Sequence, residues 1–205
     1  MTNDTKHTLP NNWRWAKLGD VISEAQPGFA CGERDPRGVI QLRMNNVNTR
    51  GNLVWDDFIR VPADSPTITK YQLISGDVVF NNTNSTELVG KSALFLSHSE
   101  PIVYSNHFTR LRVKPEKLAP VYLVSWLIYQ WQSRVFENLC NRWIGQSAVK
   151  NEKPLSLEIP LSASRYKSVT SDETYHEPPQ VTLERLQRLE QVMVDEINKL
   201  KKMIE

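Results

Sequence analysis

Four short runs of β-branched and aromatic residues lie close together between residues 78 and 113. They cover residues 78–80, 92–96, 102–104 and 107–113. This composition at such short spacing favours strands and predicts a sheet. In the last run apolar and polar residues alternate, with Arg110 and Arg112 on the same side, which predicts a strand with one solvent-facing side.

Further elements flank this sheet. An amphipathic element is predicted at 13–24, a strand at 39–44, extended chain at 52–61 and a helix at 120–139. The helix starts at Pro120, which the first helical turn tolerates, and it is apolar on most sides. It is therefore predicted to be largely buried, with Trp126 and Trp131 in the core rather than serving as stacking platforms for bases.

Several predicted strands end in amide and hydroxyl side chains. The stretches are RMNNVN at 43–48, VVFNNTNST at 78–86, SNHFTR at 105–110 and RWIGQS at 142–147, with Lys150 close behind. Asn and Gln can hydrogen-bond adenine, Arg suits guanine, and Ser, Thr and Lys commonly contact phosphates. The alternative is that these Asn-rich loops only satisfy backbone turns, and composition alone favours that alternative.

The segment from Leu183 to Ile204 has a different pattern, with apolar residues at coiled-coil spacing. The predicted helix-pairing residues are Leu183, Leu186, Met193, Ile197, Leu200 and Ile204, with Glu190 as a polar residue in the seam. A helix of this length is marginal alone in water, so we expect it to pair with a second helix. The alternative is that it folds back onto its own domain, but the polar connector before it favours projection.

The sequence argues against a membrane-spanning protein and against a secreted one. The net charge is +2, and residues 1–150 hold 17 Lys+Arg against 13 Asp+Glu, which gives a mildly basic body. The sequence has neither a long apolar run nor a secretory start, and its two cysteines are unpaired in spacing, which favours a cytoplasmic protein.

The chemistry of an enzyme is not evident in the sequence. Gly90-Lys91-Ser92 lacks the first glycine of a phosphate-binding loop, and the four histidines are scattered without metal-ligand spacing. No G-x-S-x-G motif supports a nucleophile. We therefore expect no catalysis, no metal and no cofactor.

Four stretches together resemble a known family. WRWAKLGDVISE, VIQLRMNNVNTRGNL, YQLISGDVVFNNTNSTELVGKSAL and IGQSAVKNEKPLSLEIPL occur in this order across residues 13–161. This series closely resembles a target recognition domain of the specificity subunit of type I restriction-modification enzymes. The resemblance implies sequence-specific recognition of one half of a bipartite site on double-stranded DNA. It also implies docking of methyltransferase subunits and, through them, of restriction subunits.

The resemblance also implies a fold and a division into domains. The fold class is α+β, a compact mixed domain with a twisted, mainly antiparallel sheet and packed helices, followed by a long C-terminal α-helix that forms a coiled coil. The expected parts are a leader at 1–12, the recognition domain at 13–161, a connector at 162–180 and the dimerisation helix at 181–205.

The candidate DNA-binding residues follow from the polar stretches and from the resemblance. The candidates for reading bases are Arg43, Asn45, Asn46, Asn81, Asn82, Thr83, Asn84, Ser85, Asn106, Gln146 and Ser147. The candidates for contacting phosphates are Lys91, Arg142 and Lys150.

The chain departs from the family in two respects. It has one recognition domain where members usually have two, and residues 162–177 intervene before the Pro-Pro turn that precedes the helix. The chain is therefore expected to be either a half-subunit that forms a homodimer through its helix or a fragment of a longer subunit. The alternative functions are a protein-interaction module, such as an assembly factor or antirestriction decoy, and a lone hydrolase or nuclease.

Overall fold

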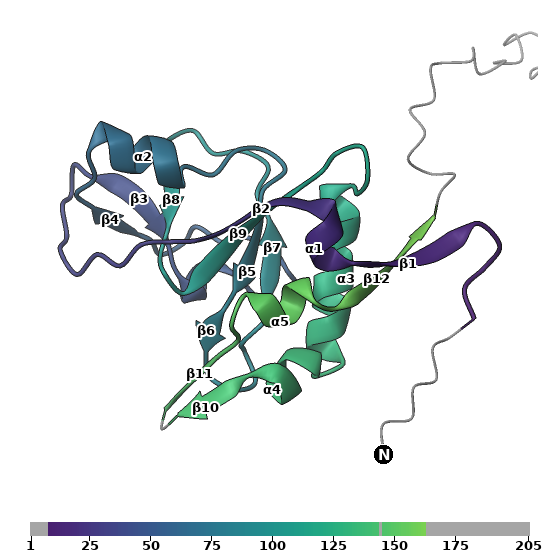
Figure 1. Ribbon diagram of the computed structural model, residues 1–205. Coiled ribbons are helices and arrows are strands. Elements are labelled where there is room, and N and C mark those ends of the chain that lie inside the picture. The colour runs from purple at the N-terminus through teal and green to yellow at the C-terminus, as the bar shows by residue number, and fades with distance from the viewer. Residues whose placement is uncertain (1–7, 144, 163–205) are drawn as a thin grey trace, which may run out of the picture. The chain divides into compact units, whose positions relative to one another are not determined.

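The computed structural model describes residues 8–143 and 145–162, all of which belong to one compact unit (Figure 1). The strands are β1 (Trp13–Lys17), β2 (Ile22–Pro27), β3 (Val39–Leu42), β4 (Ile59–Val61), β5 (Val78–Asn81), β6 (Thr83–Asn84), β7 (Ser92–Leu94), β8 (Ile102–Tyr104), β9 (Phe108–Val113), β10 (Asn141–Trp143), β11 (Gln146–Ala148) and β12 (Glu158–Ser162). The helices are α1 (Leu18–Val21), α2 (Ser65–Tyr71), α3 (Pro120–Gln132), α4 (Val135–Leu139) and α5 (Glu152–Leu155), with a 3-10 turn η1 (Met44–Asn46).

Three of the four predicted runs form one antiparallel sheet, whereas the run at 102–104 forms β8 of a second sheet and β2 completes the first. Strands β2, β9, β5 and β7 form a four-stranded sheet in that order. A second sheet has the order β4-β3-β8, in which β3 and β8 pair in parallel. The α+β class with mainly antiparallel sheets is therefore confirmed, whereas the long C-terminal helix lies outside the described residues.

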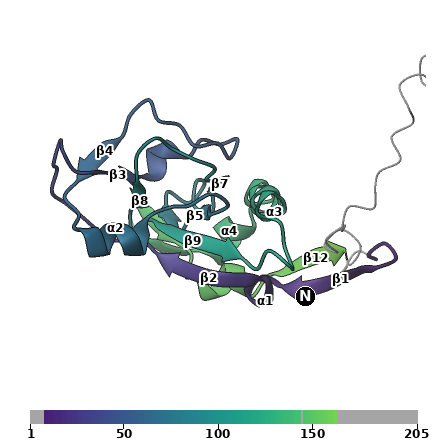
Figure 2. The same cartoon turned by 90° about the horizontal axis from the view of Figure 1, so that it is seen from above.

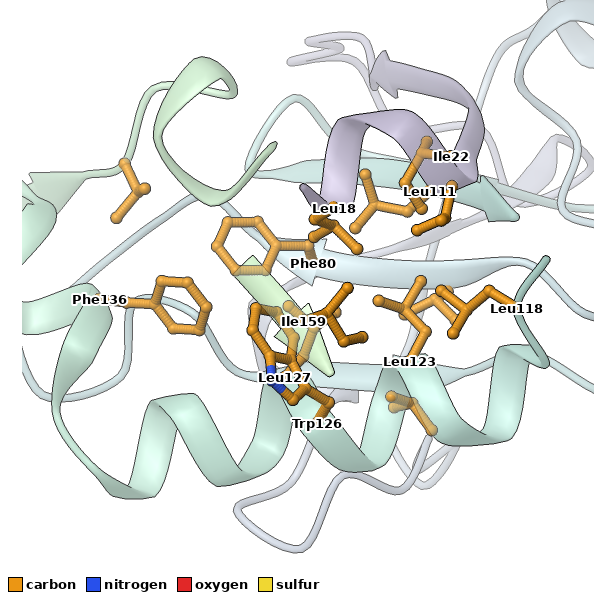
Figure 3. Close-up of a cluster of buried hydrophobic side chains, with 14 of the residues drawn as sticks. Leu18, Ile22, Phe80, Leu111, Leu118, Leu123, Trp126, Leu127, Phe136 and Ile159 are labelled. Atoms are coloured by element: carbon orange, nitrogen blue, oxygen red, sulfur yellow. The ribbon is translucent and has the colours of Figure 1, made fainter. Parts of the chain in front are cut away.

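The four-stranded sheet is covered on both faces. Val78 and Phe80 of β5 pack with Leu123, Trp126 and other residues of α3 in one core. Figure 3 shows Phe80 together with Leu123 and Trp126 in this cluster. The intervening Val79 packs with residues of β3 and β8 in a second core. A strand covered on both faces needs apolar residues at successive positions, which accounts for the run Val78-Val79-Phe80.

The predicted solvent-facing side of β9 is wrong. The Arg110 side chain is only 3% exposed, because the second sheet and the residues that follow α2 cover it. Its guanidinium lies 2.7 Å from Glu24, donates to the carbonyl of Gln72 at 2.9 Å and lies over the ring of Tyr104. The Arg110 guanidinium is therefore satisfied by an ion pair and hydrogen bonds inside the fold, and not by solvent as the alternating pattern predicted.

The predicted single helix at 120–139 is divided into α3 and α4. Arg134 adopts a left-handed backbone conformation (φ 59°), which no α-helix accommodates. The chain turns there, and Phe136 of α4 comes within 5.0 Å of Phe80, ring centre to ring centre. Helix α3 buries one side, including Trp126, while Val121 and Tyr129 are exposed, so it is less completely buried than predicted.

The first and last strands of the described domain pair with each other. Strands β1 and β12 are antiparallel, with Trp13 opposite Ser162 and Lys17 opposite Glu158. The two views in Figures 1 and 2 both show this pair at one end of the described elements. The segments that enter and leave the domain therefore lie side by side.

Candidate nucleic-acid interface

The side chains of Asn81 and Asn82 lie inside the protein, with exposed fractions of 0% and 8%. The Asn81 amide donates to the carbonyl of His107 at 2.9 Å, and that of Asn82 donates to the Thr109 hydroxyl at 3.0 Å. Their oxygens accept from the Asn84 amide and the Thr83 hydroxyl. These two amides hold the loop after β5 against the loop before β9.

Three further candidates are buried as well. Asn46 caps its own turn, accepting from the Arg43 backbone and donating to the carbonyls of Val54 and Asp57. The Lys91 ammonium donates to the carbonyl of Val47 at 2.5 Å, and burial lowers its pKa. The buried Ser147 hydroxyl lies 2.8 Å from that of Thr86.

Gly90 explains why the loop after β5 returns so tightly. Its φ is +94°, and a Cβ there would lie 2.3 Å from the Phe136 ring. The close approach lets Gly90 donate its backbone N–H to the Asn81 carbonyl at 2.8 Å. Only glycine combines this conformation with this contact.

An open depression of about 500 Å³ brings together candidates from two separate stretches. Arg43 and Asn45 line it from the turn after β3, and Asn84 lines it from β6. Asn45 is exposed, while Arg43 and Asn84 are half-buried. Lys91 and Asp57 also border the depression.

The loop before β9 lies next to this depression. Burial lowers the pKa of His107, and the positive charge of Arg43 lowers it further, so the imidazole is neutral at pH 7. The neighbouring Asn106 is exposed, and its backbone carbonyl accepts from Asn82 at 3.3 Å. The buried Asn81 and Asn82 thus join the loop that carries Asn106 to Asn84, whereas Arg43 is held separately by Asn46.

A β-hairpin of β10 and β11 extends the same region. Its second strand pairs with β6, with Ser147 opposite Asn84 and Ala148 opposite Thr83. Arg142 and Gln146 of the hairpin and the following Lys150 are exposed. The Arg142 guanidinium donates to the carbonyl of Glu137 at 3.3 Å.

The two remaining candidates of the loop after β5 are half-buried. The Thr83 hydroxyl donates to Asn82 at 2.7 Å, and the Ser85 backbone N–H donates to Asn84 at 2.8 Å. The loop is therefore held mainly by its own side chains, as the turn alternative in the sequence predicted.

Sequence reasoning missed Trp143, which is 61% exposed at the end of β10. All six tryptophans lie in the described residues, and Trp143 alone falls in the exposed class. A signal was available in the stretch RWIGQS, where a tryptophan lies between polar residues next to a turn glycine. The prediction that the α3 tryptophans lie in the core is confirmed for Trp126, whereas Trp131 is only partly buried against the core.

Two absences apply to the described part of the chain alone. Within residues 8–143 and 145–162, no cluster of three His, Cys, Asp or Glu side chains could hold a metal ion. Over the same residues, no helix combines the length and the apolarity that crossing a membrane requires.

The relatives found by comparison with known proteins come from type I restriction systems. No family model matches the chain. It is 26% identical over 160 residues to a protein of Methanocaldococcus jannaschii provisionally named the type I restriction enzyme MjaX specificity subunit. The match covers 75% of this chain and 36% of that protein.

Solved structures give the same result for the fold. The HsdS subunit from Thermoanaerobacter tengcongensis superposes with a TM-score of 0.53 at 22% identity, covering 78% of this chain and 40% of that one. The domain has the fold of a type I specificity subunit. A chain from a study of assembly and conformational transition in the type I restriction-modification system gives a TM-score of 0.54 at 21% identity, covering 95% of this chain and 46% of that one.

The resemblance to type I specificity subunits, inferred from the four stretches, is thereby confirmed. The chain spans less than half the length of each of these three matched proteins. The predicted helix-pairing residues from Leu183 to Ile204 lie outside the described residues.

Proposed function

We propose that this chain provides one target recognition domain of a type I specificity subunit. It reads one half of a bipartite site on double-stranded DNA and performs no catalysis itself. It acts in the cytoplasm with methyltransferase subunits and, through them, with restriction subunits. The similarity to proteins of type I restriction-modification systems supports methyltransferase and restriction subunits as the partners.

The observation that carries the proposal is the gathering of exposed and half-buried Arg, Asn and Gln side chains from separate segments. Arg43, Asn45 and Asn84 line one depression, and the Asn106 loop and the Gln146 hairpin are joined to it by hydrogen bonds. Arg contacts guanine and Asn or Gln contacts adenine through paired hydrogen bonds in the major groove. A rigid sheet that presents these groups on loops suits the reading of base edges.

The structure narrows the proposed contacts. Asn46, Asn81, Asn82, Lys91 and Ser147 use their polar groups inside the fold, so we now assign them to positioning instead of direct contact. The proposed base-reading residues are Arg43, Asn45, Asn84, Asn106 and Gln146, with Thr83 and Ser85 beside them. Arg142 and Lys150 remain the proposed phosphate contacts.

The proposal includes a role for residues 181–205. We propose that their helix pairs with a second helix, through Leu183, Leu186, Met193, Ile197, Leu200 and Ile204. A homodimer formed this way would carry two identical recognition domains related by two-fold symmetry. Such a dimer would read two identical half-sites in inverted orientation.

The experiment is to map methylated sites in a host that expresses this chain with its cognate methyltransferase subunit. We expect a bipartite motif, palindromic for a homodimer. The variant Arg43→Ala should relax the motif at one position, since a paired Arg–guanine contact is worth about 1–3 kcal/mol of discrimination. The matched control Arg14→Ala removes an exposed arginine of β1 and should leave the motif unchanged.

Two results would contradict the proposal. If the chain associates with methyltransferase subunits but directs no sequence-specific methylation, it is a protein-interaction module instead. An asymmetric motif would exclude the homodimer and leave the recognition domain standing.

A further inference from the structure

Trp143 lies on the open face of a small three-stranded sheet formed by β10, β11 and β6. Residues opposite each other on antiparallel strands point to the same face, and successive residues alternate. Trp143 therefore shares a face with its partner Gln146 and with Asn141. Arg142 and Ser147 point to the other face, where Ser147 bonds Thr86 and Arg142 contacts Glu137.

The base of this sheet is firmly held. The Val149 backbone N–H donates to the Asn82 carbonyl at 2.8 Å, and Ser147 is fixed by Thr86. Asn82 is itself held by Thr109 and Asn106. The hairpin therefore presents Trp143 from a rigid support, two strands away from Asn84 of β6, which lines the depression.

The surroundings of Trp143 are polar. The exposed side chains of Asn141 and Gln146 share the face of Trp143, and Lys150 is exposed where the chain leaves β11. The other exposed large apolar side chains of the described residues lie on α3 (Val121 and Tyr129) and in the loops at Phe58, Ile74 and Leu96, none of them in the hairpin. Among the described residues of the hairpin, Trp143 has amide neighbours and no second exposed large apolar side chain beside it, so these residues do not form the apolar patch typical of a protein-binding surface.

A ring in this setting suits a nucleobase. Aromatic side chains stack on bases of any identity, and the flanking amide and ammonium groups can contact base edges and phosphates. We propose that Trp143 stacks on a nucleobase of the bound DNA at a locally opened base step, as apolar wedges do in other DNA-binding proteins. This inference rests on the proposed function, and the contact that it adds is made by an uncharged side chain.

The test compares variants of the full chain, assembled with its methyltransferase subunits, on a duplex that carries the mapped motif. Trp143→Ala should weaken binding about 5- to 100-fold, while Trp143→Phe should retain most of the affinity. Tyr129→Ala, an equally exposed aromatic of α3, should bind as the unaltered chain does. Circular dichroism should be unchanged in all three.

Salt dependence separates stacking from charge. Trp143 carries no charge, so its contact with DNA displaces no counterions. Trp143→Ala should therefore leave the slope of log K against log salt unchanged, whereas Lys150→Ala should reduce it by about 1. The fluorescence difference between the unaltered chain and Trp143→Phe should fall on DNA binding, because a stacked tryptophan is quenched.

The inference is overturned if Trp143→Ala binds the duplex as the unaltered chain does. It is also overturned if the variant binds DNA normally but no longer assembles with the methyltransferase subunits, since Trp143 would then contact protein. If the unaltered assembly binds no duplex, the proposed function fails and the inference fails with it.

Discussion

The Asn82 side chain uses both ends of its amide inside the fold. The nitrogen donates to Thr109 and to the Asn106 carbonyl, and the oxygen accepts from Thr83. A buried polar group that loses its partner costs the free energy of desolvating it. Asn82 therefore contributes to stability and keeps the loops at 83–86 and 105–107 together.

Replacing Asn82 by Ala should lower the free energy of unfolding by about 1–3 kcal/mol, because Thr109 and the Asn106 carbonyl lose their partner. Urea denaturation measures the change. The control Asn106→Ala removes an exposed amide and should change stability by less than about 0.5 kcal/mol. Equal stability of the two variants would contradict the assignment of Asn82 to positioning.

Lys91 is the second residue whose environment differs from what its type suggests. Burial lowers the pKa of its ammonium below the ordinary value of 10.5. The unfolded chain therefore binds more protons than the folded chain between the two pKa values, and stability rises with pH there.

The expected result is a pH-dependent difference between the unaltered chain and Lys91→Met. As pH rises from 7 toward 10.5, the free energy of unfolding of the unaltered chain should rise relative to that of the variant. Denaturation at several pH values measures the difference. A difference that stays flat would mean that the Lys91 ammonium is solvated.

These two residues show where prediction from sequence ends. The sequence correctly places polar side chains after strands β3, β5 and β8. The identity of an Asn or Lys residue, however, does not reveal whether its polar group faces water or bonds a backbone carbonyl. Asn45 and Asn46 are adjacent, yet one is exposed and the other is 1% exposed. Only the packing of Val54 and Asp57 over Asn46 decides between them.

Among the elements, the break between α3 and α4 depends on one residue. Arg134 has a left-handed backbone, which costs a non-glycine residue about 1–2 kcal/mol, and its side chain is 79% exposed. Apolar periodicity continues across this position, so the sequence predicts one helix. The turn is imposed by the docking of Phe136 against Phe80, a contact between segments far apart in the chain.

Arg134→Gly should therefore stabilise the protein by up to about 1 kcal/mol, after the greater freedom of glycine in the unfolded chain is subtracted. Thermal denaturation should show a raised midpoint. The matched control Ser125→Gly lies in the middle of α3 and should destabilise by about 0.5 kcal/mol. A loss of stability in Arg134→Gly would show that its contact with Glu137 outweighs the backbone strain.

At the scale of the whole domain, the strand composition predicts the sheet, and the series of four stretches predicts the fold. The covering of the sheet on both faces is beyond local pattern, because it requires β3 and β8 to meet across about 60 residues of chain and close over β9. The burial of Arg110 under Tyr104 of β8 follows from that closure, whereas its ionic contact with Glu24 comes from the pairing of β2 with β9.

The pairing of β1 with β12 bears on how the coding sequence of this domain can recombine. Because the chain enters and leaves the domain at neighbouring points, a DNA segment that encodes residues 13–162 can be exchanged for another of the same fold without moving the joints on either side. Under the proposed function, one recombination event that exchanges this segment would change the recognised half-site and leave the rest of the assembly unchanged. The antiparallel strand pair would then serve as a fixed junction between an exchangeable domain and its flanking segments.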